Sequence, residues 1–385
     1  MKRTGTCVFF AVLAVLSLGA YQKASAQSDA VRAMYQSSAS IPTNISGVHT
    51  FPAPPAEFTP LTASDAELAA YGFPPRPDQK ARPDDYAKWT KAMTLARNRW
   101  NGQLKPRPEF STGLMRPVPG GTAKLAPSTS GAPTLVGSYN WSGIANTFPI
   151  KKWNSLLSVS SVLADFNVPV AQQAFSASGS GNVCDGFFDV VSVWDGIDGI
   201  NAAEVLQGGA TSYYYCNAST PQDNGAGYTA WVEWYPSYPE LDVFPVNPGD
   251  DIYVDTYAVS GACNPGFVFV EDETLQEFGT FELDWLTGPC LVGNSSEIIV
   301  ERPAGDPYTP LSLYPLANYV MDFTISEGSN NNGNVALPGS QAPATWQITM
   351  FDDTGTIPIS SPLAIGTISV VFEDEGCAAV GGCTP

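Results

Sequence analysis

Residues 228–235 read YTAWVEWY and are followed by Pro236. β-Branched and aromatic residues dominate this run, and Trp231, Glu233 and Tyr235 alternate with their neighbours, which is the pattern of a β-strand with two different faces. Residues 187–194, FFDVVSVW, form a second run of this kind. From residue 138 onward no stretch has a helical period, and turn residues separate further strand-like runs at 156–168, 251–259, 266–271, 280–286, 297–301, 311–323, 344–351 and 365–372. About ten such strands predict an all-β domain, a large antiparallel β-sandwich of two sheets of the jelly-roll or concanavalin-like kind.

Composition agrees with a chain rich in turns and excludes several classes of function. The 385 residues include 35 Gly and 33 Pro, and only 14% are charged, against about 25% in a typical domain. Lys and Arg number 18 against 37 Asp and Glu, a net charge of −19, so we expect no nucleic-acid partner, because binding to phosphates needs basic side chains. His49 is the only histidine. Residues 138–385 therefore have no histidine for Ser-His-Asp catalysis, zinc or haem, and we expect neither a metal nor a cofactor there.

The N-terminus has the three parts of a secretory signal peptide. Lys2 and Arg3 are basic, residues 7–20 are mostly apolar, and Ala24-Ser25-Ala26 is a small-residue cleavage site. We predict that residues 1–26 are removed and that the protein is secreted, to the medium, the periplasm or the cell surface, with no membrane attachment afterwards. A signal anchor is the alternative, although the apolar run is short for a bilayer.

The remaining chain divides into two parts of opposite charge. Residues 27–137 hold 12 basic and 8 acidic residues, a net of +4, whereas residues 138–385 hold 3 basic and 29 acidic residues, a net of −26. A run rich in Pro and Gly, residues 115–133, lies at the junction. We predict a basic propeptide at 27–137, called the leader below, that acts as an intramolecular inhibitor of an acidic, monomeric catalytic domain at 138–385. An N-terminal domain with an acidic partner domain is the alternative.

The leader is expected to be partly helical. Pro83 provides a helix start, Arg97 and Arg99 fall in the expected last turn, and apolar residues recur at helical spacing at Tyr86, Trp89, Met93, Ala96 and Trp100. One face of this helix is aromatic, which suits either an acidic aromatic surface or the interior of a small domain of its own. Residues 52–75, which are rich in proline, are expected to be extended.

Carboxylates are the catalytic groups that this composition leaves, as in acid peptidases and glycosidases. Asp353-Thr354-Gly355 matches the triplet of pepsin-like aspartic peptidases, which need two such loops. Residues 138–385 contain no second triplet of this kind. We therefore expect a turn between two late strands at this position.

Six segments, in the order of a known family, resemble the glutamic peptidases, or eqolisins. They are NWSG at 140–143, VWDGIDG at 193–199, VLQGG at 205–209, AWVEWYP at 230–236, PGDDI at 248–252 and SEIIVE at 296–301. The resemblance implies a secreted endopeptidase precursor with a β-sandwich and a removable propeptide, which hydrolyses polypeptides in acid solution. It implies that Gln207 and Glu301 are the catalytic pair, and that the residues lining or supporting the substrate cleft are Trp141, Trp194, Asp198, Trp231 and Glu233. Thr229 stands where fungal members often have an acidic residue.

The strand period adds a constraint on the catalytic pair. Glu297 and Glu301 face the same way on one strand but lie roughly 13 Å apart at about 3.3 Å per residue. They cannot form a pair with each other, so one of them needs a partner from another strand. In the implied mechanism, Glu301 takes a proton from the attacking water and returns it to the leaving amine, while the Gln207 amide donates to the developing oxyanion. The alternative is that Gln207 caps a turn and that Glu301 is a solvated charge at a strand end.

Six cysteines remain after removal of the signal peptide, and an oxidising compartment favours up to three disulfides. By the resemblance, Cys290 matches a family cysteine in place, and Cys216 is expected as its partner. Cys377 and Cys383 would close a short loop.

A glycan-binding module or a glycosidase is the alternative from another class. A β-sandwich rich in tryptophan could stack sugars on its indoles, and Glu233 and Glu301 could be the two carboxylates, which lie roughly 5 Å apart in a retaining glycosidase. The propeptide favours the peptidase, because glycosidases seldom need to be kept inactive.

Overall fold

The computed structural model describes residues 40–80, 82–122, 134–154, 158–172, 184–258, 263–303, 322–325, 329–330, 344–365 and 369–374. The predicted signal peptide, the second half of the Pro- and Gly-rich linker, Cys377 and Cys383 lie outside these residues. None of the helices in the described ranges is long and apolar enough to cross a membrane.

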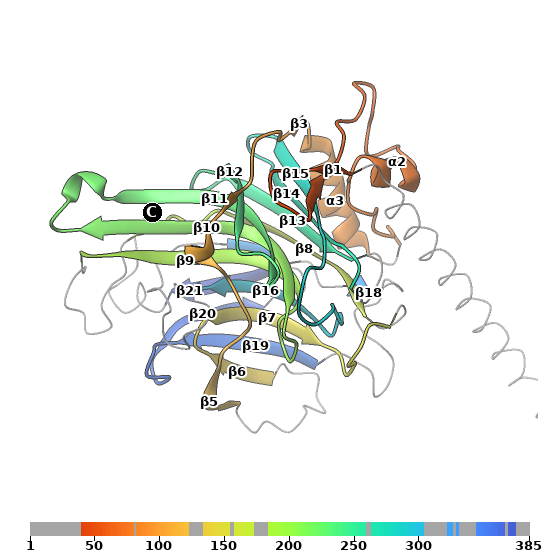
Figure 1. Ribbon diagram of the computed structural model, residues 1–385. Helices are drawn as coiled ribbons and strands as arrows, with labels where there is room; N and C mark the ends of the chain where they lie inside the picture. The colour runs from red at the N-terminus through yellow and green to blue at the C-terminus, as the bar shows by residue number, and fades with distance from the viewer. Residues whose placement is uncertain are drawn as a thin grey trace, which may run out of the picture.

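Strands dominate the described chain and form two curved layers that face each other (Figure 1). The first layer is an antiparallel sheet with the strand order β12 (Leu241–Pro245), β11 (Gly225–Tyr235), β10 (Val205–Asn217), β9 (Asp185–Asp198), β16 (Ser295–Glu301), β7 (Trp141–Thr147) and β19 (Ala344–Phe351). At its edge, β6 (Thr134–Ser138) pairs with β19 in parallel, and β5 (Pro117–Thr122) pairs with β6.

The second layer has the strand order β15 (Glu277–Leu283), β14 (Gly266–Asp272), β13 (Asp251–Tyr257), β8 (Val159–Asn167), β17 (Asp322–Ile325) and β21 (Ser369–Asp374). The short strand β18 (Ser329–Asn330) lies beside β8. One more strand, β20 (Pro358–Ile365), pairs with both β19 and β21 and so joins the two layers at one edge. The predicted all-β sandwich of two antiparallel sheets is confirmed.

One apolar core fills the space between the layers. Val193 on β9, Val232 on β11 and Val254 on β13 belong to it, and none of their surface is exposed. Burial of one such side chain stabilises the fold by about 1.5–3 kcal/mol. Because side chains alternate along a strand, the neighbours of these valines point to the outer faces of the layers. The core thereby fixes which residues of the first layer can form a site.

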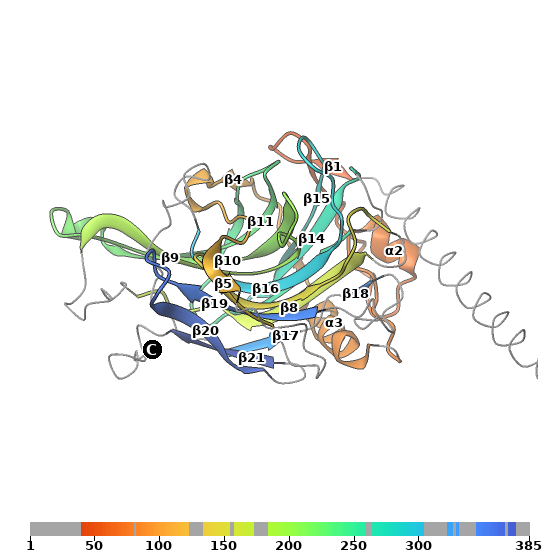
Figure 2. The same ribbon diagram turned by 90° about the horizontal axis from the view of Figure 1, so that it is seen from below.

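The leader packs on the outer face of the second layer and reaches the first. Its elements are β1 (Ile41–Pro42), β2 (Val48–Thr50), α2 (Asp65–Ala70), α3 (Pro83–Leu95), β3 (Asn98–Arg99), β4 (Lys105–Pro106) and the short 3-10 helix η1 (Pro108–Phe110). Trp89 and Met93 of α3 are buried in a cluster with Tyr257 and Phe269 of the second layer, and Figure 2 shows the two helices on this side of the molecule. At the sheet edges, β2 and β3 pair with β15, while β4 pairs with β12.

The helix α3 is shorter than the sequence predicts. It ends at Leu95, so Arg97, Arg99 and Trp100 are not helical. The N–H groups of Asn98 and Trp100 donate to carbonyl groups at the start of β15. Strand pairing therefore replaces the next helical turn.

The helix α2 interrupts the proline-rich segment that was expected to be extended. The Ser64 hydroxyl accepts from the Glu67 N–H, and the Glu67 carboxylate accepts from the Ser64 N–H at 2.8 Å. This capping box is encoded by the sequence SDAE at 64–67. The prolines around it obscure the signal.

Several strands of the sandwich are missing from the sequence prediction, among them β7, β10, β12 and β20. The strand β10 carries Gly208 and Gly209, and glycine weakens the strand signal of a sequence. The structure gives a reason for one of them, because a Cβ atom at Gly209 would lie 2.0 Å from the Val193 carbonyl oxygen on β9. Most of the run predicted at 311–323 lies outside the described residues.

The triplet at 353–355 lies in the turn between β19 and β20, as expected. The Gly355 N–H donates to the Asp352 carbonyl at 2.8 Å, and Gly355 has a φ of 70°. The Asp353 side chain is 60% exposed and pairs with Arg302 at 2.5 Å. Because the Asp353 carboxylate is exposed in a turn, it does not belong to a buried pair of catalytic aspartates.

Buried carboxyl groups make the stability of the sandwich depend on pH. Burial raises the pKa of Asp255 to about 7 and that of Glu271 well above its usual value. A carboxyl whose pKa is higher in the folded than in the unfolded state stabilises the fold fully in acid, and this contribution is lost as the pH rises through the folded pKa.

We therefore expect a higher unfolding temperature at about pH 4.5 than at about pH 7.5 in low salt. The variant Asp255→Asn cannot ionise at this position, so it should lose less stability than the wild type when the pH rises from about 4.5 to about 7.5. The difference should be up to about 4 kcal/mol, for a pKa of about 4 in the unfolded state and about 7 in the folded state. Asp223→Asn, on the exposed 3-10 helix η2 (Pro221–Asp223), is the control. Thermal melts of chain shown to be intact on gels measure the effect, and equal unfolding temperatures at the two pH values would contradict it.

Candidate functional site

The outer face of the first layer carries a row of polar side chains. Gly196 of β9 lies opposite Gln207 of β10 on one side and opposite Glu297 of β16 on the other. Gln207 also lies opposite Glu233 of β11. Directly opposite residues of antiparallel strands point to the same face, and alternation adds Glu301 of β16 to that face. We call the four side chains of Gln207, Glu233, Glu297 and Glu301 the polar row.

Tryptophan side chains form an apolar floor next to the polar row. Trp141, Trp194 and Trp231 are fully buried in one cluster with Val205 and Ile299. The rings of Trp141 and Trp194 meet edge to face with their centroids 4.9 Å apart. The three tryptophans that the resemblance assigns to a cleft therefore lie together, on the face that carries Gln207 and Glu301.

Glu301 ends β16 and is only 1% exposed. Its Oε1 accepts from Asn140 Nδ2 at 2.8 Å and from the Gly113 N–H at 3.2 Å, and its Oε2 accepts from Trp194 Nε1 at 2.9 Å. Burial raises the pKa of Glu301 well above its usual value, and the donors Asn140 and Gly113 oppose the rise. A buried carboxyl that is oriented from three sides is suited to proton transfer.

Gln207 and Glu233 form a second fully buried group on the same face. Gln207 Nε2 donates to Glu233 Oε2 at 2.9 Å and to Thr112 Oγ1 at 2.6 Å. Glu233 also accepts from Ser111 Oγ at 2.7 Å and from the Thr112 hydroxyl. Burial raises the pKa of Glu233 to about 8, although these hydrogen bonds oppose the rise. Glu233 is therefore neutral in acid solution, and it fixes the orientation of the Gln207 amide.

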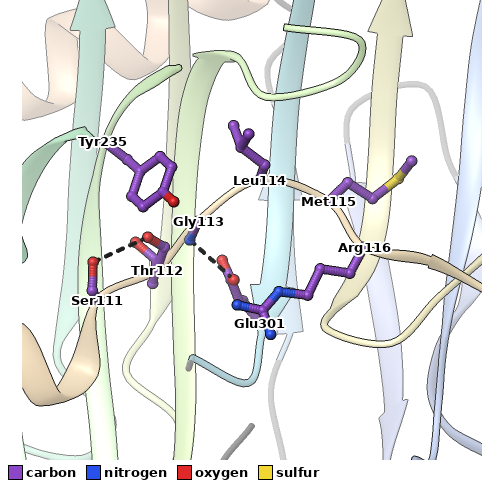
Figure 3. Close-up of a pocket in the computed structure, with 8 residues that line it drawn as sticks. All are labelled: Ser111, Thr112, Gly113, Leu114, Met115, Arg116, Tyr235 and Glu301. Atoms are coloured by element: carbon purple, nitrogen blue, oxygen red, sulfur yellow. Dashed lines mark hydrogen bonds between the residues drawn. The ribbon is translucent and has the colours of Figure 1, made fainter. Parts of the chain in front are cut away.

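Residues 111–116 of the leader cross the polar row between η1 and β5 (Figure 1). They line a pocket together with Tyr235 and Glu301 (Figure 3). Thr112 places its hydroxyl against Gln207 and Glu233, and Gly113 directs its N–H at Glu301. The side chains of the next two residues, 114 and 115, pack against the tryptophan floor. A stretch of the same polypeptide thus contacts both the Gln207 group and Glu301.

Asp198 supports the site from behind rather than lining it. Its carboxylate accepts from the N–H groups of Val292, Gly293 and Asn294 at 2.6, 2.9 and 2.7 Å. Burial raises its pKa to about 6, against these hydrogen bonds. The bonds hold the loop that enters β16, so Asp198 acts on the strand that carries Glu301.

Sequence reasoning missed two contributors to this site. Asn140 belongs to the segment NWSG, but nothing in the sequence joins its amide to Glu301. Residues 111–113 of the leader are Ser, Thr and Gly, a composition typical of a linker. Only the packing of the leader places these residues on the polar row.

One group among the described residues has the geometry to hold a metal ion. His49, Glu282 and Asp284 bring three potential ligand atoms within 4.8 Å of one another. They lie at the contact of β2 with β15 in the second layer, and not on the face with Gln207.

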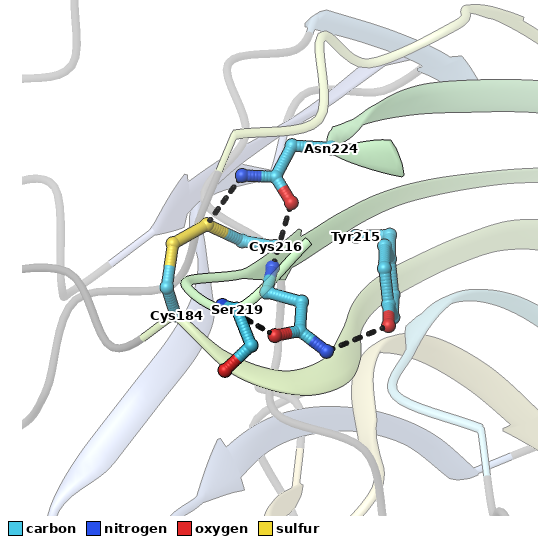
Figure 4. Close-up of a disulfide and its surroundings, with 6 residues drawn as sticks. Cys184, Tyr215, Cys216, Ser219 and Asn224 are labelled. Atoms are coloured by element: carbon cyan, nitrogen blue, oxygen red, sulfur yellow. Dashed lines mark hydrogen bonds between the residues drawn. A yellow bond between two sulfur atoms is a disulfide. The ribbon is translucent and has the colours of Figure 1, made fainter. Parts of the chain in front are cut away.

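The described cysteines form two disulfides, and the expected pair Cys216–Cys290 is wrong. Cys184 is bonded to Cys216 (Figure 4), and Cys263 is bonded to Cys290. In both disulfides the Cα atoms are 4.7 Å apart.

Strand register decides these partners. Asp185 of β9 lies opposite Asn217 of β10, which brings together the two cysteines next to them. The other two cysteines flank the hairpin of β14 and β15, whose pairing brings its two ends together. The sequence alone does not reveal either register.

The contacts of Thr112 predict how firmly the leader is held on the polar row. Thr112→Val removes the hydroxyl bonded to Gln207 and Glu233 and leaves buried polar groups unpaired, at a cost of about 1–3 kcal/mol. We expect amide hydrogen exchange across residues 109–116 to become about tenfold faster or more at neutral pH. Thr94→Val on α3, whose hydroxyl bonds the Thr90 carbonyl, is the control. Unchanged exchange in Thr112→Val would show that the hydroxyl does not hold the leader.

Comparison with known proteins gives one family match. A family model described as the Peptidase A4 family matches residues 139–357. One similar solved structure is scytalido-glutamic peptidase with a transition state analog inhibitor, at 18% identity and a TM-score of 0.42. Another is SCP-B, a member of the Eqolisin family, in a complex with a tripeptide, at 16% identity and a TM-score of 0.41. Each match covers 61% of this chain and 98% of the other. Aspergilloglutamic peptidase from Aspergillus niger is 23% identical with a TM-score of 0.38, over 48% of this chain and 99% of the other. The search of curated proteins found no match.

Proposed function

The chain belongs to the Peptidase A4 family and is a peptidase, and on this premise we propose that it is a secreted endopeptidase that acts in acid solution and is made as a precursor. In this proposal Glu301 is the general base, Gln207 is the oxyanion donor and the leader is the intramolecular inhibitor. One observation carries it: residues 112 and 113 of the leader are hydrogen-bonded to Gln207 and to Glu301. A polypeptide therefore fits across both side chains. The family match does not support the carbohydrate alternative.

Glu301 acts first on water and then on the leaving amine. Its ionised carboxylate takes a proton from the water that attacks the peptide carbonyl, and the neutral carboxyl then donates this proton to the nitrogen of the breaking bond. The Gly113 N–H, 3.2 Å from Glu301 Oε1, supports this role, because the nitrogen of a bound peptide group comes within reach of the carboxylate. While the leader covers Glu301, burial raises its pKa and so favours the neutral carboxyl; once the leader leaves and water enters, the pKa falls and the ionised base forms more readily.

Gln207 stabilises the oxyanion of the tetrahedral intermediate. Glu233 holds one N–H of Gln207 Nε2, and the other points at Thr112 Oγ1, where the oxyanion of a substrate would accept it. Because the pKa of Glu233 is raised to about 8, Glu233 is uncharged in acid and does not repel the oxyanion. One such donor typically contributes about 10²–10³-fold to kcat.

A cluster of charges ties α3 of the leader to the second layer. Lys91 lies 2.5 Å from Glu273 and 3.3 Å from both Asp165 and Asp251. Burial raises the pKa of Glu273 to about 7 and also raises that of Asp165, so these ion pairs form at neutral pH and are lost progressively as the pH falls. This hold on the leader is therefore strongest at neutral pH and weakens as the solution becomes more acid.

The catalytic pair is tested by single substitutions in the matured enzyme. Glu301→Gln keeps the size of the side chain but cannot accept a proton, and Gln207→Ala removes the oxyanion donor, so each should lower kcat by about 10²–10³-fold or more with little change in KM. Glu233→Gln, which keeps Gln207 oriented, should have a smaller effect, and Glu297→Gln is the control on the same strand. Hydrolysis of a denatured protein at acid pH is the assay. Near-normal turnover by folded Glu301→Gln protein would falsify the assignment.

Maturation of the precursor is tested by its dependence on pH. We expect the purified precursor to be stable at neutral pH and to cleave itself near pH 3–4, where carboxylates titrate, giving a mature chain that starts between Met115 and Ser138. Lys91→Gln should mature about fivefold faster at about pH 5, for an ion-pair contribution of roughly 1 kcal/mol, while Lys80→Gln at an exposed position should not. Intact mass and N-terminal sequencing follow the reaction. If Glu301→Gln precursor matures as fast as wild type, self-processing is wrong.

A further inference from the structure

We propose that Asn140 is a positioning residue that joins the main chain of a bound substrate to Glu301. This inference rests on the proposed function, and it identifies a backbone-binding subsite that the catalytic pair does not explain. The substrate feature it recognises is an extended stretch of at least four residues on the leaving-amine side of the scissile bond.

The Asn140 side chain uses all of its hydrogen-bonding capacity. Its Nδ2 donates to Glu301 Oε1 at 2.8 Å and to the Leu114 carbonyl at 3.2 Å. Its Oδ1 accepts from the Arg116 N–H at 2.8 Å and from Ser138 Oγ at 3.1 Å. A primary amide has two donor hydrogens and two acceptor lone pairs, so this network admits one orientation of the group. Asn140 is only 1% exposed.

The two contacts of Asn140 with the leader involve main-chain atoms alone. The amide binds the carbonyl of residue 114 and the N–H of residue 116 in the way that a neighbouring strand would. Such contacts do not depend on the side chains of the bound chain. If residue 113 marks the first residue after the scissile bond, the subsite reads the second carbonyl and the fourth N–H of that side of the substrate.

The same amide stabilises the ionised form of Glu301. Its N–H opposes the effect of burial on the carboxylate. The turn that carries Asn140 is also fixed to the strand of Glu301, because the Arg302 N–H donates to the Asn140 carbonyl at 3.1 Å. When a substrate carbonyl and N–H hold the amide from the other side, its donor remains aimed at Glu301 as water is expelled.

The inference is tested with peptide substrates that carry one N-methyl group. Methylation at the fourth residue after the scissile bond removes the N–H that Asn140 would bind, whereas methylation at the third residue leaves it intact. For the matured wild-type enzyme we expect kcat/KM to fall roughly 3- to 10-fold more for the fourth position than for the third. In Asn140→Ala this difference should disappear, and in the control Asn146→Ala it should remain. Asn146 lies on β7, where its side chain bonds Thr345.

The pH profile gives a second, independent readout. Loss of the Asn140 N–H should move the acid limb of kcat/KM to higher pH by about half a unit or more, because the ionised carboxylate loses a donor. Substitution of a residue that only stabilises the fold would change neither the acid limb of the kcat/KM profile nor the response to N-methylation of the substrate. Should Asn140→Ala fail to fold, the comparison of the two methylated peptides on wild-type enzyme still decides the subsite.

The possible failures are distinguishable from one another. Equal penalties at the third and fourth positions on wild-type enzyme, or an unchanged difference together with an unchanged acid limb in Asn140→Ala, would overturn the role of Asn140 and leave the catalytic pair in place. An active Glu301→Gln enzyme would instead overturn the proposed function on which the role depends.

Discussion

The site depends on the pairing of β9 with β10 on one side and with β16 on the other. Gly196 lies opposite both Gln207 and Glu297, and a Cβ atom there would lie 3.1 Å from the Leu206 carbonyl oxygen and 3.2 Å from the Gln207 Cβ. A side chain at position 196 would therefore press against Gln207, the residue that the strand register places opposite it. Trp194, two residues before Gly196 on β9, lies on the same face and donates a hydrogen bond to Glu301. One strand thus sets the place of Gln207 and the orientation of Glu301.

The leader's hold on this face responds to pH in two opposing ways. Between about pH 4 and 7, ionisation of the carboxylates around Lys91 strengthens the hold, whereas burial of Glu301 under the leader weakens it, because an open cleft lets that carboxyl ionise. Near pH 4, where an ordinary glutamate is only partly ionised, the open cleft gains less from the ionisation of Glu301, while the ion pairs around Lys91 are lost. Under the proposed function, acid would therefore release the leader in the pH range where the loss of the ion pairs exceeds this gain.

Alternation along strands was sufficient to predict the sandwich and the shared face of Glu297 and Glu301, and six short segments identified the family. Features that depend on register or on tertiary packing could not be predicted. The partners of Cys216 and Cys290 follow from two hairpins, and α3 stops at Leu95 because the chain beyond it pairs with β15. Asn140 joins the site only through the turn that brings it to Glu301. Local patterns carry no information about such long-range contacts.

Under the proposed mechanism, a chain that lies across Gln207 and Glu301 should be cleaved, and the contacts of residues 111–113 give a reason why the leader would resist cleavage there. Both hydrogens of Gln207 Nε2 are bound, one by Glu233 and one by the Thr112 hydroxyl. The Ser111 hydroxyl, which donates to Glu233 at 2.7 Å, lies 3.4 Å from the Thr112 carbonyl oxygen. The peptide group whose nitrogen meets Glu301 is therefore not polarised by Gln207. Gly113 is not required by space, since a Cβ there would lie 3.9 Å from the Tyr235 ring. In the proposed mechanism, the hydroxyl of the preceding residue, rather than the glycine, would make the covering chain an inhibitor.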